Sequence, residues 1–226
     1  MEKRGKNFSG VYSIIENTEE KLATLNLVPG NQVYGEKLVI QKGQEYRIWD
    51  PFRSKLAAAM LNGLAKLPFK EGSQVLYLGV STGTTASHVS DILGFNGVLF
   101  GVEFAPRVAR EFVGRCANYR NNIMPIVEDA RKPENYYSIF GKIDTIYCDI
   151  AQVDQTEIAV TNSKLFLEKG NHLLLVVKSR SINVIKNPQR VFEEEAEKLR
   201  KAGFVIEQII NLKPFDKDHA LIDARL

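Results

Sequence analysis

The arrangement of apolar and polar residues changes near residue 50. Before it, short segments rich in β-forming residues are separated by proline and glycine, which predicts strands over residues 11–15, 32–34, 37–41 and 46–49. No cluster of reactive side chains stands out in this part. We therefore predict a small β-rich domain over residues 1–50, and a second domain over residues 51–226 that carries the chemistry.

The second part alternates fully apolar segments with segments of helical periodicity. We predict helices over residues 51–67, 84–93, 106–119, 155–168 and 188–202, the first with Asp50 as its N-cap and Pro51 in its first turn. Apolar strands are predicted over residues 74–79, 98–103, 124–127, 143–149, 172–178, 204–212 and 220–225. Such strands between helices are typical of a parallel sheet covered on both faces.

The final two predicted strands are joined by a short link, residues 213–218, so we expect them to pair as an antiparallel hairpin. The fold class is therefore α/β. A mostly parallel, Rossmann-like sheet of seven strands that closes with one antiparallel hairpin is the architecture of class I S-adenosylmethionine-dependent methyltransferases. The small N-terminal β-rich domain is additional to it.

A glycine-containing turn follows the first strand of this sheet. Gly79 ends the strand, and Gly83 precedes a helix that begins at Thr84 and Thr85. Ligands of doubly wound sheets lie at the carboxyl ends of the strands, beside the first one. The spacing differs from the G-x-G-x-x-G dinucleotide fingerprint, and the turn lacks the lysine of a P-loop. Its hydroxyls and amides suit the amino-acid end of S-adenosylmethionine better.

Acidic residues end the next strands. Glu103 is placed to accept hydrogen bonds from two ribose hydroxyls, with Phe104 available to cover an adenine face. Asp129 is placed to accept from the adenine amino group, with the Ala130 amide nearby. One such carboxylate alone is usually a solvated loop residue. Acidic residues at the ends of successive strands, after such a turn, favour a cofactor site.

Composition limits the classes of function. The chain has 226 residues, 30 basic and 27 acidic, and a net charge of +3, too little for strong sequence-independent RNA binding by counterion release alone. No apolar stretch approaches the roughly 20 residues that span a bilayer, and the first residues are not typical of a secretory signal. Cys116 and Cys148 lack metal-ligand spacing, so we expect no metal, no membrane association, and reduced thiols in the cytoplasm.

Long motifs in the chain resemble the fibrillarin family. They are WDPFRSKLAAAML, LYLGVSTGTTASHVSDI, GVLFGVEFAPR, EDARKPENY, YCDIAQVDQ and LLLVVKSRSI, and the similarity extends over essentially the whole chain. One departure is Thr82, where the family pattern has serine and the hydroxyl is kept. The chain lacks a Gly/Arg-rich leader, so it resembles the archaeal form, which implies a cytoplasmic location.

The resemblance implies S-adenosylmethionine-dependent 2′-O-methylation of rRNA, with tRNA as a further candidate substrate, within a box C/D ribonucleoprotein. The implied partners are the box C/D guide RNA, the target rRNA, a coiled-coil scaffold protein and, indirectly, a kink-turn-binding ribosomal-type protein. Guide pairing would then select the target, because side chains seldom read the deep, narrow major groove of an RNA helix.

The resemblance also implies site residues. The catalytic set falls on Lys55, Asp149, Lys178 and His219. Cofactor contacts fall on Thr84, Thr85, Glu103, Phe104, Asp129, Ala130, Asp149 and Gln152, and we add the glycines of the turn, Gly79 and Gly83, and the residues between the last two contacts, Ile150 and Ala151.

Several alternatives stay open from the sequence. Lys178 would either accept a proton from the ribose hydroxyl or only orient it, while Lys55 and His219 alone would pass for solvated charges. One other class is a methyltransferase for a protein side chain such as glutamine, or for a base, although CDIAQVDQ lacks the Asn/Asp-Pro-Pro-aromatic motif usual for base amines. A third is a non-catalytic subunit of an RNA particle, which the intact Lys55, Asp149 and Lys178 disfavour.

Overall fold

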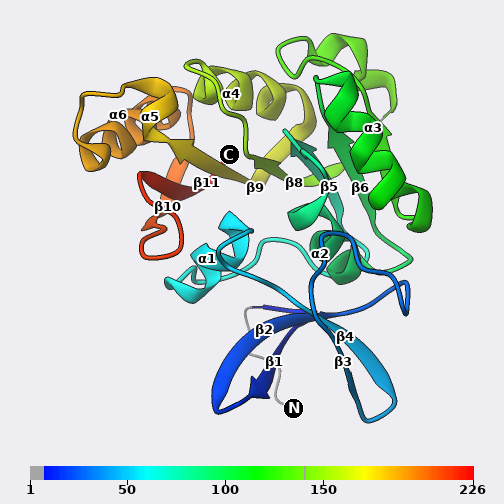
Figure 1. The fold of residues 1–226 in the computed structure, drawn as a ribbon. Helices are drawn as coiled ribbons and strands as arrows, with labels where there is room; N and C mark the ends of the chain where they lie inside the picture. Colours follow the sequence, from blue (N-terminus) through cyan, green and yellow to red (C-terminus); the bar gives the residue numbers. More distant parts are fainter. Residues whose placement is uncertain (1–7, 140) are drawn as a thin grey trace.

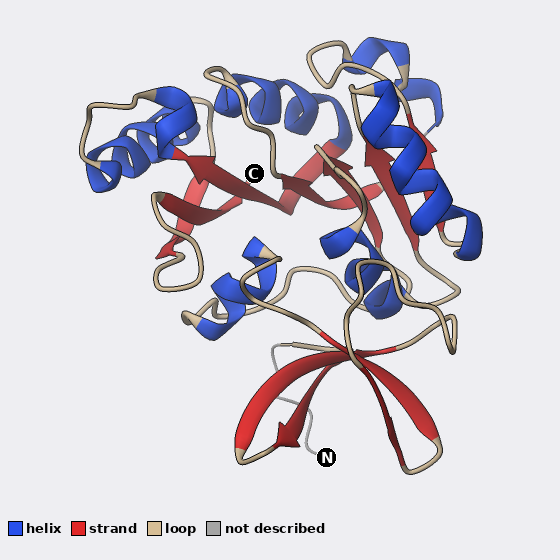
Figure 2. Ribbon diagram, viewed as in Figure 1, coloured by secondary structure: helices blue, strands red, loops and turns tan. Residues whose placement is uncertain are grey.

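The computed structural model describes residues 8–139 and 141–226, which form two sheets. A seven-stranded sheet lies across the middle of the molecule, and a four-stranded sheet lies beneath it at the N-terminal end (Figure 1). Helices flank the larger sheet on both sides, while the smaller sheet is joined to it through loops and α1 (Figure 2). None of the helices in the described ranges is long and apolar enough to cross a membrane.

The larger sheet has the predicted class I methyltransferase topology. Its strands run in the spatial order β10-β11-β9-β8-β5-β6-β7. β5 to β9 pair in parallel, and β11 pairs antiparallel with both β9 and β10. The strands are β5 (Gln74–Leu78), β6 (Val98–Val102), β7 (Ile123–Ile126), β8 (Ile143–Cys148), β9 (Leu167–Lys178), β10 (Val205–Asn211) and β11 (His219–Arg225).

Two apolar clusters fill the space on either face of this sheet because successive strand residues point to opposite sides. On one face, Tyr77 and Val176 pack with residues of α1, α2 and α3, among them Phe112. On the other face, Leu78 and Val177 pack with residues of α4 and α6. The strands are therefore buried on both sides, which explains their continuous apolar sequences.

The helices follow the prediction except at their ends. They are α1 (Lys55–Leu61), α2 (Thr84–Leu93), α3 (Pro106–Arg115), α4 (Gln155–Phe166), α5 (Ser179–Ile182) and α6 (Pro188–Lys201). The short α5 was not predicted, and 3₁₀ turns occupy Ala117–Tyr119, Pro133–Asn135 and Tyr137–Ile139.

The predicted start of the first helix at residue 51 is wrong. Ser54 is the N-cap residue, and its hydroxyl accepts a hydrogen bond from the Ala57 amide. Asp50 instead accepts from the Phe52 amide at 2.8 Å and stabilises a turn. An aspartate side chain can cap a helix or stabilise a turn, and here Asp50 stabilises the turn while Ser54 caps the helix. The helix also ends at Leu61, six residues before the predicted end.

The smaller sheet has the order β1-β2-β4-β3, with strands β1 (Val11–Glu16), β2 (Glu19–Leu25), β3 (Leu38–Gln41) and β4 (Gln44–Ile48). β2 was missed because it opens with charged residues. The strand predicted over residues 32–34 is wrong. The Val33 and Tyr34 amides donate to the Glu36 carboxylate, so they do not form hydrogen bonds to a neighbouring strand. The exact domain boundary after residue 50 stays a prediction.

A buried ion cluster fixes the smaller sheet to α2. The Arg47 guanidinium bonds the carboxylates of Glu36 and Asp91, the latter at 2.8 Å. Arg120 reaches Asp91 from the other side at 2.5 Å. All four side chains are almost fully buried. Removing one partner from such a cluster leaves an uncompensated buried charge, which costs about 3–5 kcal/mol.

His88 of α2 belongs to the same interface. Its imidazole contacts the Thr24 hydroxyl at 2.8 Å and the Tyr34 hydroxyl at 2.7 Å, and it stacks on Trp49 with ring centroids 4.7 Å apart. Burial, and then the nearby Arg47 and Arg120 cations, lower the pKa of His88 well below its ordinary value of 6.5. The imidazole is therefore neutral in the folded protein.

The lowered pKa of His88 predicts how the stability of the folded protein changes with pH. As pH falls below about 6.5, the unfolded chain protonates His88 while the folded protein does not, so acid favours unfolding. The free energy of unfolding should decrease between pH of about 7 and about 5 in the parent protein, and decrease less in His88→Gln, whose amide does not titrate. Urea unfolding across this range measures both slopes. Equal slopes for the two proteins would contradict the assignment.

Candidate functional site

A pocket of about 350 Å³ opens at the carboxyl ends of β5 to β9, where the fold is expected to bind a ligand. Most of the predicted cofactor residues line it: Gly79, Glu103, Phe104, Asp129, Ala130, Asp149, Ile150, Ala151 and Gln152. Lys178 lines it as well. The chain thus brings the ends of five strands to one cavity.

Gly79 is required at this edge by its backbone conformation and by its neighbours. Its φ angle is +78°, in the region that favours glycine. A Cβ atom there would lie 3.0 Å from the Asp149 carbonyl oxygen and 3.1 Å from Ile150 Cγ1. The glycine therefore lets the turn after β5 approach the segment that follows β8, and the two segments share one pocket wall.

Three other predicted cofactor residues of this segment, Gly83, Thr84 and Thr85, lie outside the pocket lining, whereas Ser81 of the turn is part of it. Gly83 is the N-cap residue of α2, and an added Cβ would meet Phe112 Cδ2 at 2.8 Å, so packing against α3 accounts for the glycine. The buried Thr85 hydroxyl lies 2.9 Å from that of Ser54 and also bonds Tyr77. Cofactor contacts by Gly83, Thr84 and Thr85 stay predictions.

The Glu103 carboxylate is held in place by main-chain amides. Oε2 accepts from the Ser81 amide and Oε1 from the Ala105 amide, each at 3.0 Å. The first bond ties the turn after β5 to the end of β6. Beside it, the Phe104 ring is 68% exposed and lines the pocket, so one aromatic face is available for stacking.

Arg131 links the two acidic loops across the pocket rim. Its amide donates to Asp129 Oδ1 at 3.0 Å, and its guanidinium bonds Asp154 at 2.9 Å and Gln152 Oε1 at 3.1 Å. The hydrogen bond from Arg131 lowers the pKa of the Asp154 carboxyl. The structure thus gives Arg131 an ion pair with Asp154.

Asp149, which lines the pocket, lies between two lysines. Lys55 Nζ is 3.2 Å from Asp149 Oδ2, and Lys178 Nζ is 2.7 Å from Asp149 Oδ1. Lys178 Nζ also donates to the Asp149 carbonyl oxygen at 2.8 Å. The lysines come from α1 and the end of β9, so the structure brings together three of the four predicted catalytic residues.

His219 is beside this group through the sheet register. It opens β11 opposite Lys178 of β9. Its Nδ1 lies 2.5 Å from Asp216 Oδ1, an acidic neighbour that sequence reasoning did not single out. The imidazole is thus oriented by the loop before β11, and the catalytic role of His219 stays a prediction.

Gln155 is a further residue that sequence reasoning missed. Its side chain is completely buried at the first turn of α4. Oε1 accepts from the Lys178 amide at 3.1 Å, and Nε2 donates to the Gln152 carbonyl oxygen at 2.9 Å. It therefore fixes the end of β9 to the loop after β8. The only signal in the sequence is a polar residue at the start of an otherwise apolar helix face.

The chain is similar to known proteins over almost its whole length. A family model described as fibrillarin matches residues 2–226. The fibrillarin-like rRNA/tRNA 2′-O-methyltransferase of Thermococcus sibiricus is 51% identical over 226 residues, covering 100% of this chain and 99% of that protein.

Two solved structures are also similar. Aeropyrum pernix fibrillarin in complex with natively bound S-adenosyl-L-methionine is 47% identical, with a TM-score of 0.91 over 98% of this chain and 96% of that one. A fibrillarin/Nop5p complex contains a chain that is 36% identical, with a TM-score of 0.85 over 97% of this chain and 99% of that one.

The geometry of Glu103 generates a binding prediction. Glu103→Ala should weaken S-adenosylmethionine binding by about ten- to a hundredfold, because bonds to a charged acceptor contribute about 1.5–3 kcal/mol. Isothermal titration calorimetry measures the affinity. Glu193→Ala, at an exposed position of α6, is the matched control and should bind normally. An unchanged affinity in Glu103→Ala would remove this residue from the cofactor site.

Proposed function

This chain belongs to the fibrillarin family, and on that premise we propose that it transfers a methyl group from S-adenosylmethionine to ribose 2′-hydroxyls of rRNA and tRNA. The observation that supports the proposal best is the ion-paired group of Lys55, Asp149 and Lys178, of which Asp149 and Lys178 line the strand-end pocket.

The pocket residues fit the cofactor. The Glu103 carboxylate, held by two amides, faces the pocket as an acceptor for two ribose hydroxyls. Phe104 offers an aromatic face for adenine, and Asp129 offers an acceptor for the adenine amino group. Asp149, whose main chain lies close to Gly79, would hold the methionine end of the cofactor, because its carboxylate suits an ammonium group. The donors and acceptors match a zwitterionic nucleoside better than a polyphosphate.

The protein would accelerate methyl transfer mainly by positioning the reacting groups. A ribose 2′-hydroxyl is a weak nucleophile, and S-adenosylmethionine supplies a methyl group already activated by its sulfonium centre. Holding the reacting groups in line can provide a large part of the acceleration, and proton transfer adds about 10²–10⁴-fold. The protein therefore needs a fixed polar group beside the acceptor oxygen.

Lys178 is that group. Its Nζ donates a hydrogen bond to the Asp149 carbonyl oxygen at 2.8 Å and forms an ion pair with Asp149 Oδ1 at 2.7 Å. An ammonium group has three N–H bonds, so donor capacity remains to hold the acceptor hydroxyl. Asp149 in turn is held from the other side by Lys55. In this assignment Lys178 orients the ribose, and Asp149 links the cofactor end of the pocket to the acceptor end.

We propose the same kind of assembly for this chain as for its relative in the fibrillarin/Nop5p complex. Its scaffold partner would be the counterpart of Nop5p, with a box C/D guide RNA, the target rRNA and, indirectly, a kink-turn-binding protein completing a cytoplasmic particle. The net charge of +3 is too small for strong RNA binding by this chain alone, which supports a particle in which the partners bind most of the RNA.

The first test separates binding from rate. Lys178→Ala should abolish transfer while leaving S-adenosylmethionine affinity nearly unchanged, and Asp149→Ala should reduce both. Lys178→Arg should not restore activity, because the guanidinium fork does not fit a single hydroxyl. Single-turnover methylation in the assembled particle and calorimetry provide the two readouts. Near-normal transfer by Lys178→Ala would exclude it from the mechanism.

The second test concerns the assembly. The isolated chain should methylate free RNA poorly, and activity should appear when scaffold, kink-turn-binding protein and guide RNA are added. Mapping of new 2′-O-methyl groups measures this, with a guide of altered sequence as the control that should move the modified nucleotide. Efficient, site-specific methylation by the chain and RNA alone would refute the dependence on partners.

A further inference from the structure

Two loops that meet beside the strand-end pocket follow strands that are not neighbours. Arg131 follows β7 and Asp154 follows β8, and β5 and β6 lie between these two strands in the sheet. Neighbouring strands are about 4.8 Å apart, so three such spacings separate β7 from β8. The Arg131 side chain nevertheless reaches the loop after β8, and its contact therefore crosses the distance between the two strand ends.

The guanidinium of Arg131 fits the Asp154 carboxylate as a fork. Nε donates to Oδ2 and Nη2 donates to Oδ1, each at 2.9 Å. Nη2 also donates to Gln152 Oε1 at 3.1 Å. Asp154 makes no capping hydrogen bond to the first turn of α4, so both of its oxygens are available to Arg131. Bidentate pairs of this kind have a geometric specificity that the point charge of a lysine does not provide.

The same contact sets the orientation of the Gln152 side-chain amide. An arginine can only donate hydrogen bonds, so the amide oxygen of Gln152 must face Arg131 and the amide nitrogen must lie on the other side. Within residues 8–139 and 141–226 this nitrogen has no hydrogen-bond partner, and both Gln152 and Arg131 line the pocket. Nε2 is therefore left as a donor for an acceptor atom of a bound cofactor.

A second, buried contact holds the loop after β7 independently of Arg131. Asn162 of α4 donates to the Ala130 carbonyl oxygen at 2.8 Å and accepts from the Tyr136 hydroxyl at 2.6 Å, and it is completely buried. The Arg131 and Asp154 side chains, by contrast, are 41% and 43% exposed. Exposed ion pairs are weak and sensitive to salt, so the outer contact can open while the inner one keeps the loop in place.

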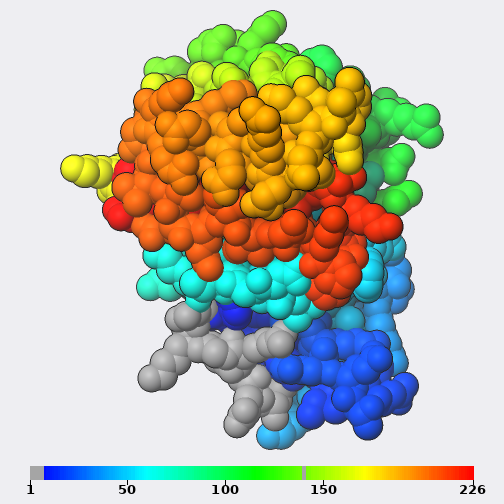
Figure 3. All heavy atoms as spheres, turned by 90° about the vertical axis from the view of Figure 1, so that its left-hand side faces the viewer, coloured from blue at the N-terminus to red at the C-terminus, as the bar shows by residue number. Residues whose placement is uncertain are grey.

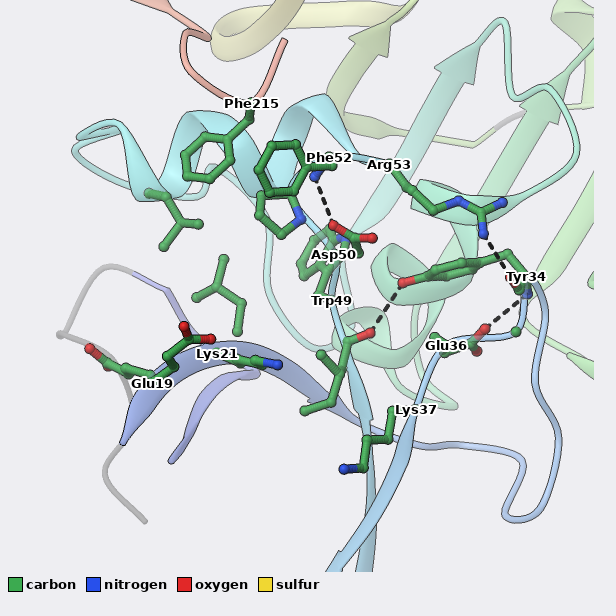
Figure 4. A pocket seen from close by; sticks show the side chains of 16 residues that line it. Glu19, Lys21, Tyr34, Glu36, Lys37, Trp49, Asp50, Phe52, Arg53 and Phe215 are labelled. Carbon is green, nitrogen blue, oxygen red and sulfur yellow. Dashed lines mark hydrogen bonds between the residues drawn. The ribbon is translucent and has the colours of Figure 1, made fainter. Parts of the chain in front are cut away.

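Arg53 is an exposed arginine at a different cavity and provides a comparison. It lines a cavity of about 690 Å³ between the smaller sheet, the turn before α1 and the loop before β11, where it donates to the Tyr34 carbonyl oxygen at 2.9 Å (Figure 4). Space-filling atoms show α1 as a band between the N-terminal sheet and the C-terminal elements, and this cavity borders that junction (Figure 3). No described residue lines both cavities, so Arg53 is separate from the cofactor pocket.

We propose that Arg131 is a positioning residue for the cofactor: by joining Asp154 and Gln152 it closes the pocket rim, orients the Gln152 amide as a donor, and so slows cofactor release. The proposal rests on the proposed function, because it takes S-adenosylmethionine as the ligand of the pocket. Among the described residues Asp154 does not belong to the pocket lining, so it acts on the cofactor through Arg131.

The test measures cofactor release from the full chain. Radiolabelled S-adenosylmethionine is bound, an excess of unlabelled S-adenosylmethionine is added, and the retained label is followed with time. Arg131→Ala should release the cofactor about three- to fivefold faster, without slower association, and should weaken the calorimetric affinity accordingly. Asp154→Asn keeps a good N-cap residue for α4 and should also accelerate release. The double variant should add little to Arg131→Ala, because both changes remove one contact.

The controls separate this contact from a general effect of charge. Arg131→Lys keeps the charge but cannot form the fork, so it should release the cofactor as fast as Arg131→Ala. Lys132→Ala removes the neighbouring exposed charge, and Arg53→Ala removes an arginine of the other cavity, so both should release it at the parent rate. Higher salt should accelerate release from the parent but not from Arg131→Ala.

The outcomes distinguish this role of Arg131 from the proposed function. If the parent chain binds S-adenosylmethionine and either Arg131→Ala or Arg131→Lys releases it at the parent rate, the role is wrong while the proposed function stands. If Arg131→Ala releases it at the parent rate but loses cross-linking to a guide–target RNA duplex, Arg131 contacts RNA and the proposal is overturned. If the parent chain does not bind S-adenosylmethionine, both proposals fail.

Discussion

The buried contact between Arg47 and Asp91 is the constraint on which the rest of the structure depends. It joins β4 of the smaller sheet to α2, the helix that follows the turn after β5. Charges inside a protein are tolerated only when every one is paired, and here Glu36 and Arg120 complete the set. The smaller sheet thus has one position relative to α2, and α2 has one position relative to the cofactor pocket.

The fixed position of the smaller sheet and α2 explains how predicted catalytic residues from distant parts of the chain meet. The buried Ser54 and Thr85 hydroxyls, 2.9 Å apart, join the first turns of α1 and α2. The next residue after Ser54 is Lys55, which therefore reaches Asp149 from a defined direction. On the opposite side, Gln155 fixes the main chain of Lys178. Lys55 is thus positioned by the contact between Ser54 and Thr85, and Lys178 by its hydrogen bond to Gln155.

The sequence allowed the large sheet to be predicted well because its strands are apolar on both faces and its helices have clear starts. It failed where local signals compete: Asp50 and Ser54 are both suitable N-caps, and only packing selects Ser54. Among site residues, Glu103 and Asp149 were found because they end strands.

Gln155 and Asp216 were not found. Gln155 bonds Lys178, which lies 23 positions further along the chain, and periodicity does not encode such a contact. Asp216 lies three residues before His219, in a turn that the apolar pattern does not describe. Part of the site, the Thr84 and Thr85 contacts among them, rests on family resemblance alone.

The position of β11 has a consequence for synthesis. It is last in chain order, yet it lies between β10 and β9 in the interior of the sheet. A nascent chain that has reached only residue 212 therefore exposes the unpaired edge of β9, which is rich in leucine and valine and ends in Lys178. Open edges of this kind attract other strands. The polypeptide is therefore expected to be most prone to aggregation before β11 covers this edge, which ends in the predicted catalytic Lys178.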